Sequence, residues 1–337
     1  MRKTIIAFSV FIFFITNLIR INAYNHSSYV LMDAVSGRVL YEKNKDERFL
    51  TASIAKIMTC IVAIENGNLF EKYKVDYETI SMEGSSIYLE LDDEILLYDL
   101  LCGLMLRSGN DAATLISKSV FNNVNNFVFE MNLMAREIGM SNSTFENPTG
   151  LNTTTRNYST AYDMALLMRY AMENEIFFDI SSKKTHVAQT LNNKYYWQNK
   201  HKLVANTDYV ISGKTGYTKS SGRTLVSYAL INDMKLIAVS FNEGGDYELH
   251  KLLFENAKNN FINEKIIKKG VYAQEINTLN YYPATKNDIN ILVKKGADVS
   301  VKFYLLDKPK KECGYLEILE DNKLIYRDAL YPYYPQS

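Results

Sequence analysis

A serine and a lysine stand three positions apart at the start of an almost wholly apolar segment. Ser53 and Lys56 begin this segment, which continues to Ile64. Residues three apart share one face of a helix, so the lysine amine can reach the serine hydroxyl. Because burying a charged amine is costly, few roles other than activating a nucleophile explain a lysine there. The pair therefore predicts nucleophilic catalysis by Ser53.

Two further motifs follow in order along the chain. Ser108-Gly109-Asn110 falls in a break between two helical segments, and Lys214-Thr215-Gly216 follows a short strand-like run. Each motif is common by itself, and Ser181-x-x-Lys184 even repeats the first one. We expect that second copy to have no buried helix behind it. The informative feature is therefore the ordered trio.

The segments around the motifs predict the elements that position them. Thr51 is expected to cap the buried helix, and Gly67 to end it. The periodicity and turn signals predict other helices at 99–106, 111–120, 124–138, 161–172 and 249–261, and strands at 29–32, 38–41, 224–231 and 235–241. A helix-rich middle between strands from both ends predicts one α/β (α+β) domain over residues 24–262.

The two ends of the chain differ from this middle. Residues 1–23 have basic Arg2 and Lys3, an apolar core and a cleavage site after Ala23, which indicate a signal peptide; an uncleaved membrane anchor is the alternative. Either form predicts an extracytoplasmic protein, secreted or associated with the cell envelope. Residues 265–337 contain short strand-like segments and predict a small β-rich C-terminal domain: 271–276, 289–293, 299–305, 315–319 and 324–326.

Composition excludes several classes of function. The formal net charge is zero, and it becomes −3 without residues 1–23, which contain three basic residues and no acid. This balance argues against a nucleic-acid partner. The cysteines are odd in number, and Cys60 and Cys102 lie in apolar runs, so we expect buried thiols. The four histidines show no metal-ligand spacing, so no metal or cofactor is expected.

The ordered trio resembles the active-site set of penicillin-binding proteins and serine β-lactamases. Leu50-Thr51-Ala52-Ser53, Asn147-Pro148-Thr149-Gly150-Leu151 and Lys214-Thr215-Gly216-Tyr217-Thr218 narrow the resemblance to D-alanyl-D-alanine carboxypeptidases, the serine peptidases among the low-molecular-mass penicillin-binding proteins. It spans residues 28–262. It implies a transpeptidase-type domain with an antiparallel sheet flanked by helices and an all-helical subdomain. It also implies that the terminal D-alanine of peptidoglycan pentapeptide stems is removed through an acyl-enzyme on Ser53, and that β-lactam antibiotics inhibit covalently.

The same resemblance suggests roles for the lysine and the second motif. Lys56 would be the general base, and it can serve only when neutral. A free lysine has a pKa of about 10.4, so burial and a nearby cation, Lys214, would have to lower the pKa of Lys56. Ser108 would relay the proton to the leaving D-alanine. Asn110 would orient Lys56 and the substrate amide.

The third motif suits the substrate's carboxylate. Lys214 offers a charge and Thr215 a hydroxyl, while Gly216 lets the substrate approach the strand closely. The resemblance places the oxyanion hole at the backbone N–H groups of Ser53 and Tyr217.

One departure and three alternatives remain open. Many relatives have an arginine before the closing helix, but residues 244–250 contain none, and His250 or Arg223 would have to compensate. A DD-endopeptidase, a class A-like β-lactamase and a non-catalytic penicillin-binding protein are the rival functions. Gly109 and the absence of an asparagine four residues after Glu146 argue against the lactamase. The C-terminus lacks the amphipathic membrane helix of many relatives.

Overall fold

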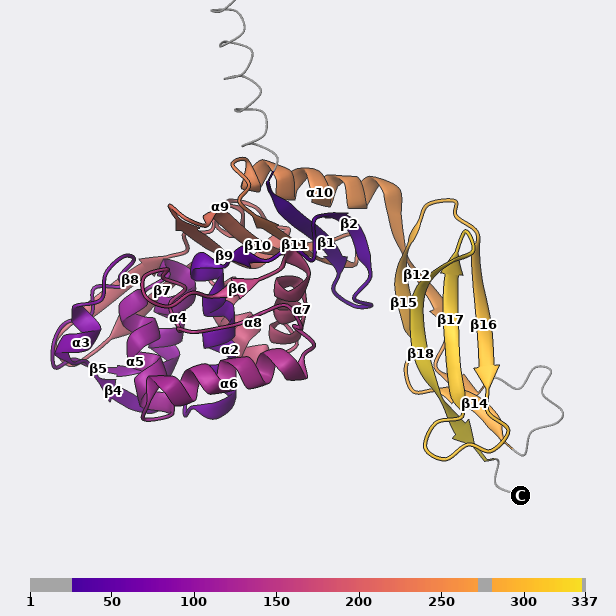
Figure 1. The fold of residues 1–337 in the computed structure, drawn as a ribbon, viewed down its shortest axis with the longest axis horizontal. Coiled ribbons are helices and arrows are strands. Elements are labelled where there is room, and N and C mark those ends of the chain that lie inside the picture. The colour runs from indigo at the N-terminus through magenta and orange to yellow at the C-terminus, as the bar shows by residue number, and fades with distance from the viewer. Residues whose placement is uncertain (1–25, 272–280, 335–337) are drawn as a thin grey trace, which may run out of the picture.

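The computed structural model describes residues 26–271 and 281–334 (Figure 1). The expected signal peptide lies outside these residues, as does most of the strand expected at 271–276. A main sheet and the helices around it form the larger part of the molecule, and a separate group of strands follows (Figure 1).

The main sheet is antiparallel, with five strands in the order β2-β1-β11-β10-β9. These strands are β1 (Ser28–Asp33), β2 (Val39–Lys43), β9 (Val210–Thr218), β10 (Gly222–Ile231) and β11 (Met234–Phe241). The predicted β10–β11 hairpin is confirmed, and both residues of its turn, Asn232 and Asp233, have positive φ. Positive φ at both positions matches the right-handed twist of the flanking strands. Strand β9 stands at one edge, which leaves half of its backbone groups without a strand partner.

Helices cover both faces of this sheet (Figure 1). Successive side chains of a strand point to opposite faces of the sheet. Val30 and Met32 of β1 therefore lie in the larger core, which contains most of the helices, and Leu31 lies in a second core under α10 and α9. The helices are η1 (Ala52–Ala55, 3₁₀), α2 (Lys56–Asn66), α3 (Tyr77–Ile80), α4 (Leu97–Arg107), α5 (Asn110–Val120), α6 (Val124–Glu137), α7 (Ala161–Ala171), α8 (Glu175–Ser182), α9 (Lys202–Asn206) and α10 (Asp246–Asn260).

Three short ribbons accompany the helical region. They pair β3 (Phe49–Leu50) with β6 (Tyr158–Ser159), β4 (Lys72–Lys74) with β5 (Glu94–Leu96), and β7 (Thr185–Gln189) with β8 (Lys194–Gln198). Helix α2 lies at the centre of the helical region, and its residues from Lys56 to Ile64 are all buried. This confirms the central helix expected from its apolar sequence.

Strands β12 to β18 form the C-terminal part, residues 261–334, which has its own core. They are β12 (Phe261–Ile267), β13 (Gly270–Val271), β14 (Tyr282–Thr285), β15 (Ile289–Lys294), β16 (Val299–Leu305), β17 (Gly314–Glu320) and β18 (Lys323–Tyr333). Arg38 joins this part to the main sheet. Its guanidinium donates to both carboxylate oxygens of Glu320, at 3.1 and 2.6 Å, and to Leu292 O at 2.5 Å.

One local expectation was wrong. Thr51 has helical dihedral angles and makes no capping hydrogen bond, because the chain enters α2 through the 3₁₀ turn η1. The second Ser-x-x-Lys copy has no buried helix behind it, as expected, because Ser181 lies in the last turn of α8 and strand β7 follows. Lys184 lies beyond the end of α8 and is exposed, so Ser181 and Lys184 do not share a helix face.

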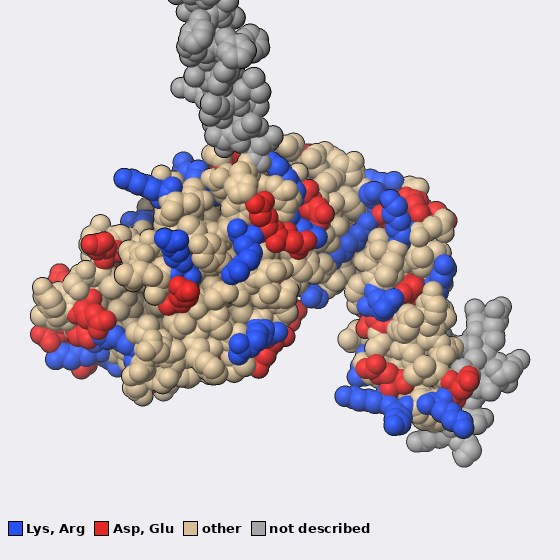
Figure 2. All heavy atoms as spheres, viewed as in Figure 1, with Lys and Arg blue, Asp and Glu red and all other residues tan. Residues whose placement is uncertain are grey.

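The surface and the thiols agree with the composition. Basic and acidic side chains are interspersed on the face shown in Figure 2, without an extended region of one sign. Cys60, Cys102 and Cys313 are free and buried, as expected for the first two. Within residues 26–271 and 281–334, no helix is long and apolar enough to cross a bilayer.

Candidate active site

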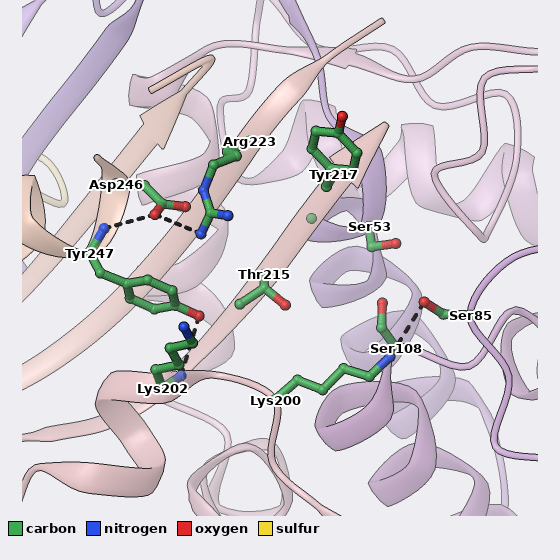
Figure 3. A pocket seen from close by; sticks show the side chains of 11 residues that line it. Ser53, Ser85, Ser108, Lys200, Lys202, Thr215, Tyr217, Arg223, Asp246 and Tyr247 are labelled. Atoms are coloured by element: carbon green, nitrogen blue, oxygen red, sulfur yellow. Dashed lines mark hydrogen bonds and ion pairs between the residues drawn. The ribbon is translucent and has the colours of Figure 1, made fainter. Parts of the chain in front are cut away.

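Ser53 lies at the entrance to α2 and faces a cavity of about 460 Å³ (Figure 3). Ala52, directly before it, has φ +47°, a left-handed conformation that costs a non-glycine residue free energy. This turn presents the Ser53 side chain, which is partly exposed, at the cavity floor while Ala52 and Ile54 stay buried. The same turn leaves the Ser53 N–H in the first helical turn, where it has no intrahelical acceptor.

Lys56 is fully buried, and oxygen atoms of three other residues surround its amine. The Nζ atom is 3.2 Å from Ser53 Oγ and 2.7 Å from Asn110 Oδ1, and it also donates to the carbonyl oxygen of Thr149. Burial lowers the pKa of Lys56 to about 7, with a further lowering by the charge of Lys200 that the charge of Asp111 opposes. Lys200 is therefore a repelling cation that the sequence did not indicate, and the expected cation, Lys214, also repels Lys56, because the charge of Lys56 lowers the pKa of Lys214.

Lys56 Nζ has three oxygen partners, which fit the three N–H donors of its charged form, and the neutral amine can use the same set. A neutral amine has two N–H donors and one lone pair. Two fixed carbonyl-type acceptors, Asn110 Oδ1 and Thr149 O, use the two donors. The lone pair then remains for the hydroxyl of Ser53, which can donate its proton at 3.2 Å. This arrangement is that of a nucleophile and its general base.

Ser108 reaches the same cavity from the junction of α4 and α5. It has φ +68°, and its hydroxyl is buried without any hydrogen-bond partner among the described residues. A buried unpaired hydroxyl in a strained conformation is costly, and such features concentrate at functional sites. The Ser108 hydroxyl is thus free to exchange a proton with a ligand in the cavity.

Asn110, the first residue of α5, ties Lys56 to the loop at 83–90. Its Nδ2 donates to Glu83 O at 2.6 Å and its backbone N–H to Ser85 O at 2.7 Å. The neighbouring Asp111 accepts the N–H of Ile87. Asn110 keeps a second amide N–H that these contacts do not use.

The edge strand β9 forms the opposite wall. Gly216 lies so close to Ser53 that a Cβ atom on residue 216 would stand 2.8 Å from Ser53 N, and it would also overlap Thr224 Oγ1. Gly150 has φ +77° and packs against the same turn, where a Cβ would collide with Ala52 O. Both positions therefore require glycine for the close approach of three chain segments at the nucleophile.

Lys214 is buried on β9, and its amine donates to Thr215 O at 3.0 Å. Burial lowers the pKa of Lys214 well below its usual value, and the charges of Lys56 and Lys200 lower it further. Thr215 and the exposed Tyr217 line the cavity with Gly216. The structure thus places Ser53, Ser108, Thr215, Gly216 and Tyr217 on the lining of one cavity, with Lys56 and Asn110 hydrogen-bonded behind Ser53.

The two residues considered as substitutes for the missing arginine lie in different places. His250 is fully buried between Ser227 Oγ, at 2.8 Å, and Ser240 Oγ, at 3.0 Å, and does not face the cavity. Arg223 is opposite Tyr217 in the β9–β10 register and lines the cavity, where it pairs with Asp246 at 2.9 Å (Figure 3). Of the two candidates, Arg223 is therefore the one that lines this cavity.

Sequence reasoning missed other residues that line the cavity. Lys200 comes from the link between β8 and α9, Lys202 from the start of α9, Ser85 from the 83–90 loop, and Tyr247 from the start of α10 (Figure 3). No local pattern marks Lys200, which approaches Ser85 Oγ at 3.5 Å only through the tertiary fold.

A helix-borne Ser–Lys pair, a loop serine and an edge strand define a serine hydrolase that acts by acyl transfer. The sequence profile of the D-alanyl-D-alanine carboxypeptidases, peptidase family S11, matches residues 17–245, and the chain belongs to this family. It is 31% identical over 301 residues to the D-alanyl-D-alanine carboxypeptidase DacF of Bacillus subtilis, covering 82% of this chain and 75% of that protein. It is 30% identical to a D-alanyl-D-alanine endopeptidase of Escherichia coli, covering 65% of this chain and 72% of that protein.

Solved structures agree with this assignment. Penicillin-binding protein 5 from Haemophilus influenzae superposes with a TM-score of 0.79 at 26% identity, covering 91% of this chain and 96% of that one. The predicted fold class and the predicted serine-type carboxypeptidase function are both confirmed. The coverage includes the C-terminal strands as well as the catalytic part.

Proposed function

We propose that this enzyme removes the terminal D-alanine from peptidoglycan stems ending in D-Ala-D-Ala through an acyl-enzyme on Ser53. One observation supports this most strongly: the buried Lys56 amine, with a pKa of about 7, is held by Asn110 Oδ1 and Thr149 O and lies 3.2 Å from Ser53 Oγ. A general base works best when its pKa is near the working pH.

Acylation follows from this geometry. The Ser53 hydroxyl gives its proton to Lys56 while Oγ attacks the carbonyl carbon of the penultimate D-alanine. The Ser53 and Tyr217 N–H groups stabilise the negative charge on the carbonyl oxygen. The peptide C–N bond breaks, and the leaving amine receives a proton through the Ser108 hydroxyl, which returns Lys56 to its neutral form.

Deacylation repeats these steps with water as the nucleophile. Lys56 takes a proton from the water, the ester bond to Ser53 Oγ breaks, and the shortened stem leaves with a new carboxylate. A β-lactam enters the first step in the same way. Its leaving nitrogen remains tethered to the acyl group, so water is hindered and the ester persists.

The substrate's terminal carboxylate would bind Lys214, Thr215 and Arg223. Arg223 has donors beyond the one used by Asp246, and its side chain is 45% exposed. A carboxylate beside Lys214 would raise the lowered pKa of that amine, so binding would be accompanied by proton uptake. Arg223→Gln should raise KM about tenfold with little change in kcat, since one charged contact is lost in substrate and transition state alike.

Two relatives are D-alanyl-D-alanine endopeptidases, so a second candidate activity is the cutting of D-Ala cross-links. Both reactions use the same acylation step and differ in the leaving group, a free D-alanine or a cross-linked side chain. Incubation with a pentapeptide and, separately, with a cross-linked dimer would separate them. We expect release of D-alanine from the first to be faster.

The test is mass spectrometry of a cell-wall pentapeptide after incubation with the enzyme, together with labelling by a fluorescent penicillin. Wild type should release D-alanine and become labelled on Ser53. Ser53→Ala should lose both while keeping its circular dichroism spectrum and melting temperature. Labelling that persists in Ser53→Ala would refute the assignment of the nucleophile.

The relatives are named D-alanyl-D-alanine carboxypeptidases, and the proposed substrate, peptidoglycan, lies outside the cytoplasmic membrane. We propose that residues 1–23 direct export, either as a cleaved signal peptide or as an anchor. N-terminal sequencing of the exported protein would distinguish these two forms, because cleavage would leave Tyr24 first.

A further inference from the structure

The active-site cavity continues into two further hollows. A second cavity, of about 450 Å³, shares Ser53, Ser85, Lys200 and Tyr217 with the first. A third, of about 560 Å³, shares Ser86, Tyr88 and Arg107 with the second. The three cavities therefore adjoin one another in a row from Ser53 to the β7–β8 ribbon. We call the far end of this row, lined by Tyr88, Arg107, Lys194 and Tyr196, the upstream groove.

The walls of the upstream groove present aromatic rings to solvent. The Tyr88 side chain is 76% exposed and that of Tyr196 is 61% exposed. Strand alternation buries the neighbours of Tyr196, Tyr195 and Trp197, which stack on each other, so the ribbon holds Tyr196 outward. Neither tyrosine hydroxyl bonds to any described residue, and exposed aromatic surfaces of this kind mark binding sites.

Tyr88 is held in a backbone conformation that costs free energy. It has φ +62°, a conformation that a bulky residue adopts only under constraint. Its N–H donates to Ser86 Oγ at 2.8 Å, and Ser86 Oγ donates to the buried Asp111 at 2.6 Å. Asp111 follows Asn110, which bonds to Lys56. The loop that carries Tyr88 is therefore fixed to the start of helix α5. Strain maintained in this way suggests that the position of the ring matters.

Arg107 supplies a charge at the junction of the second and third cavities. Its guanidinium forms no hydrogen bond or ion pair with any residue in the described ranges, although it repels Lys200 and lowers that lysine's pKa. Lys194 adds a second cation, and Glu90, which Asn193 engages, is the acidic residue of this wall. A planar guanidinium fork without a partner suits a carboxylate.

We propose that the upstream groove binds the part of the peptidoglycan strand that precedes D-Ala-D-Ala. Arg107 contacts a stem-peptide carboxylate, and Tyr88 and Tyr196 stack against the N-acetylated sugars from which the stem hangs. The occupant follows from adjacency, because a stem bound with its D-Ala-D-Ala end at Ser53 would extend into the cavity that shares Ser53, and from there toward Tyr88 and Arg107. The proposal rests on the proposed function and specifies which substrate the same site prefers.

Kinetics on three substrates would test the two parts of the groove separately. They are an acyl-D-Ala-D-Ala tripeptide, the free pentapeptide stem, and that stem carried on its disaccharide. In wild type, kcat/KM should rise at each extension. Arg107→Gln should remove about fivefold of the gain from tripeptide to pentapeptide. Tyr196→Ala should remove roughly three- to tenfold of the gain from pentapeptide to disaccharide-pentapeptide.

The matched control is Tyr77→Ala, because Tyr77 is also exposed, at 74%, but lines none of these cavities. It should keep all three rates. Equal kcat/KM for the free and the disaccharide-linked stem in wild type would overturn the proposal, as would gains that survive in both groove variants.

Calorimetry separates this proposal from the catalytic one. The ligand is the disaccharide-tripeptide without either D-alanine, titrated into wild type and into Tyr196→Ala. Binding to wild type that weakens in the variant supports the groove even if D-alanine release fails. Absence of binding, with normal D-alanine release from the tripeptide, overturns the groove and leaves the catalytic proposal standing.

Discussion

Lys56 shows how burial changes the chemistry of one residue. In water its amine would be almost fully charged at neutral pH, and holding it neutral there would cost about 4–5 kcal/mol. In the folded enzyme its pKa is about 7, mainly because α2 removes it from solvent. The free energy of folding thus includes the cost of preparing a base, which is a common origin of the trade-off between stability and activity.

This pKa sets a pH dependence for acylation. Only neutral Lys56 accepts the Ser53 proton, so the acylation rate by a penicillin should rise with pH up to about 7 and then level. Below that value it should fall about tenfold for each pH unit. Stopped-flow measurement of the acylation rate from pH 5 to 8 would show this rise.

Variants of two lysines give the controls for that profile. Lys56→Ala should lose acylation at every pH. Lys184→Ala removes the lysine of the second Ser-x-x-Lys sequence. This lysine is exposed and does not line the cavity, so the variant should keep the wild-type dependence of the acylation rate on pH. A wild-type rate that does not change between pH 5 and 8 would contradict the role of Lys56.

At the scale of elements, the site depends on the closeness of η1 and β9. Gly216→Ala would place a Cβ 2.8 Å from Ser53 N and against Thr224 Oγ1, so one of these segments must shift. Because oxyanion donors act only in precise positions, we expect kcat/KM for D-alanine release to fall roughly a hundredfold. Steady-state kinetics would measure this.

Gly244→Ala is the matched control for that substitution. Residue 244 has no heavy atom within 4 Å of a built Cβ, and it lies outside the active-site cavity. Its kcat/KM and melting temperature should match those of wild type. Equal activity of Gly216→Ala and wild type would show that the close approach is dispensable.

The predictability of each element followed from how local its signal was. Helix α2 and the β10–β11 hairpin were predicted because a continuous apolar run and a two-residue turn specify them locally. The β7–β8 ribbon and helices α8 and α9 were missed, since their short and mixed patterns gain stability only from packing. The ordered motifs predicted Ser53, Lys56 and Lys214 as site residues. Arg223 and Lys200 reach the cavity through strand register and tertiary contact, which local sequence does not specify.

At the scale of the whole molecule, the contact of Arg38 with Glu320 joins the catalytic and C-terminal parts. Their side chains are only 10% and 5% exposed. Burial alone would raise the pKa of Glu320, but hydrogen bonds from Arg38 and from the Lys294 N–H outweigh it and hold that pKa below its usual value. The stabilisation is therefore fully present above pH 4.5 and is lost as pH falls through the lowered pKa.

Removing Arg38 would leave a buried carboxylate without its partner. Arg38→Ala should lower the free energy of unfolding by about 3 kcal/mol at pH 7, and this difference should shrink as Glu320 is protonated below pH 4. Thermal unfolding at several pH values would measure it. Arg327→Ala, which breaks a more exposed pair with Glu317, should cost much less. Equal losses in the two variants would argue against a joining role for Arg38.

The free edge of β9 has a consequence for inhibitor design. A ligand that lies along this edge bonds to backbone groups, which no side-chain substitution in the enzyme removes. Strand-shaped peptidomimetics with an electrophile opposite Ser53 and an anion near Arg223 would therefore meet a higher barrier to resistance than compounds that depend on side-chain contacts alone. The same edge gives such compounds a fixed direction, because antiparallel and parallel pairing place their hydrogen-bonding groups differently.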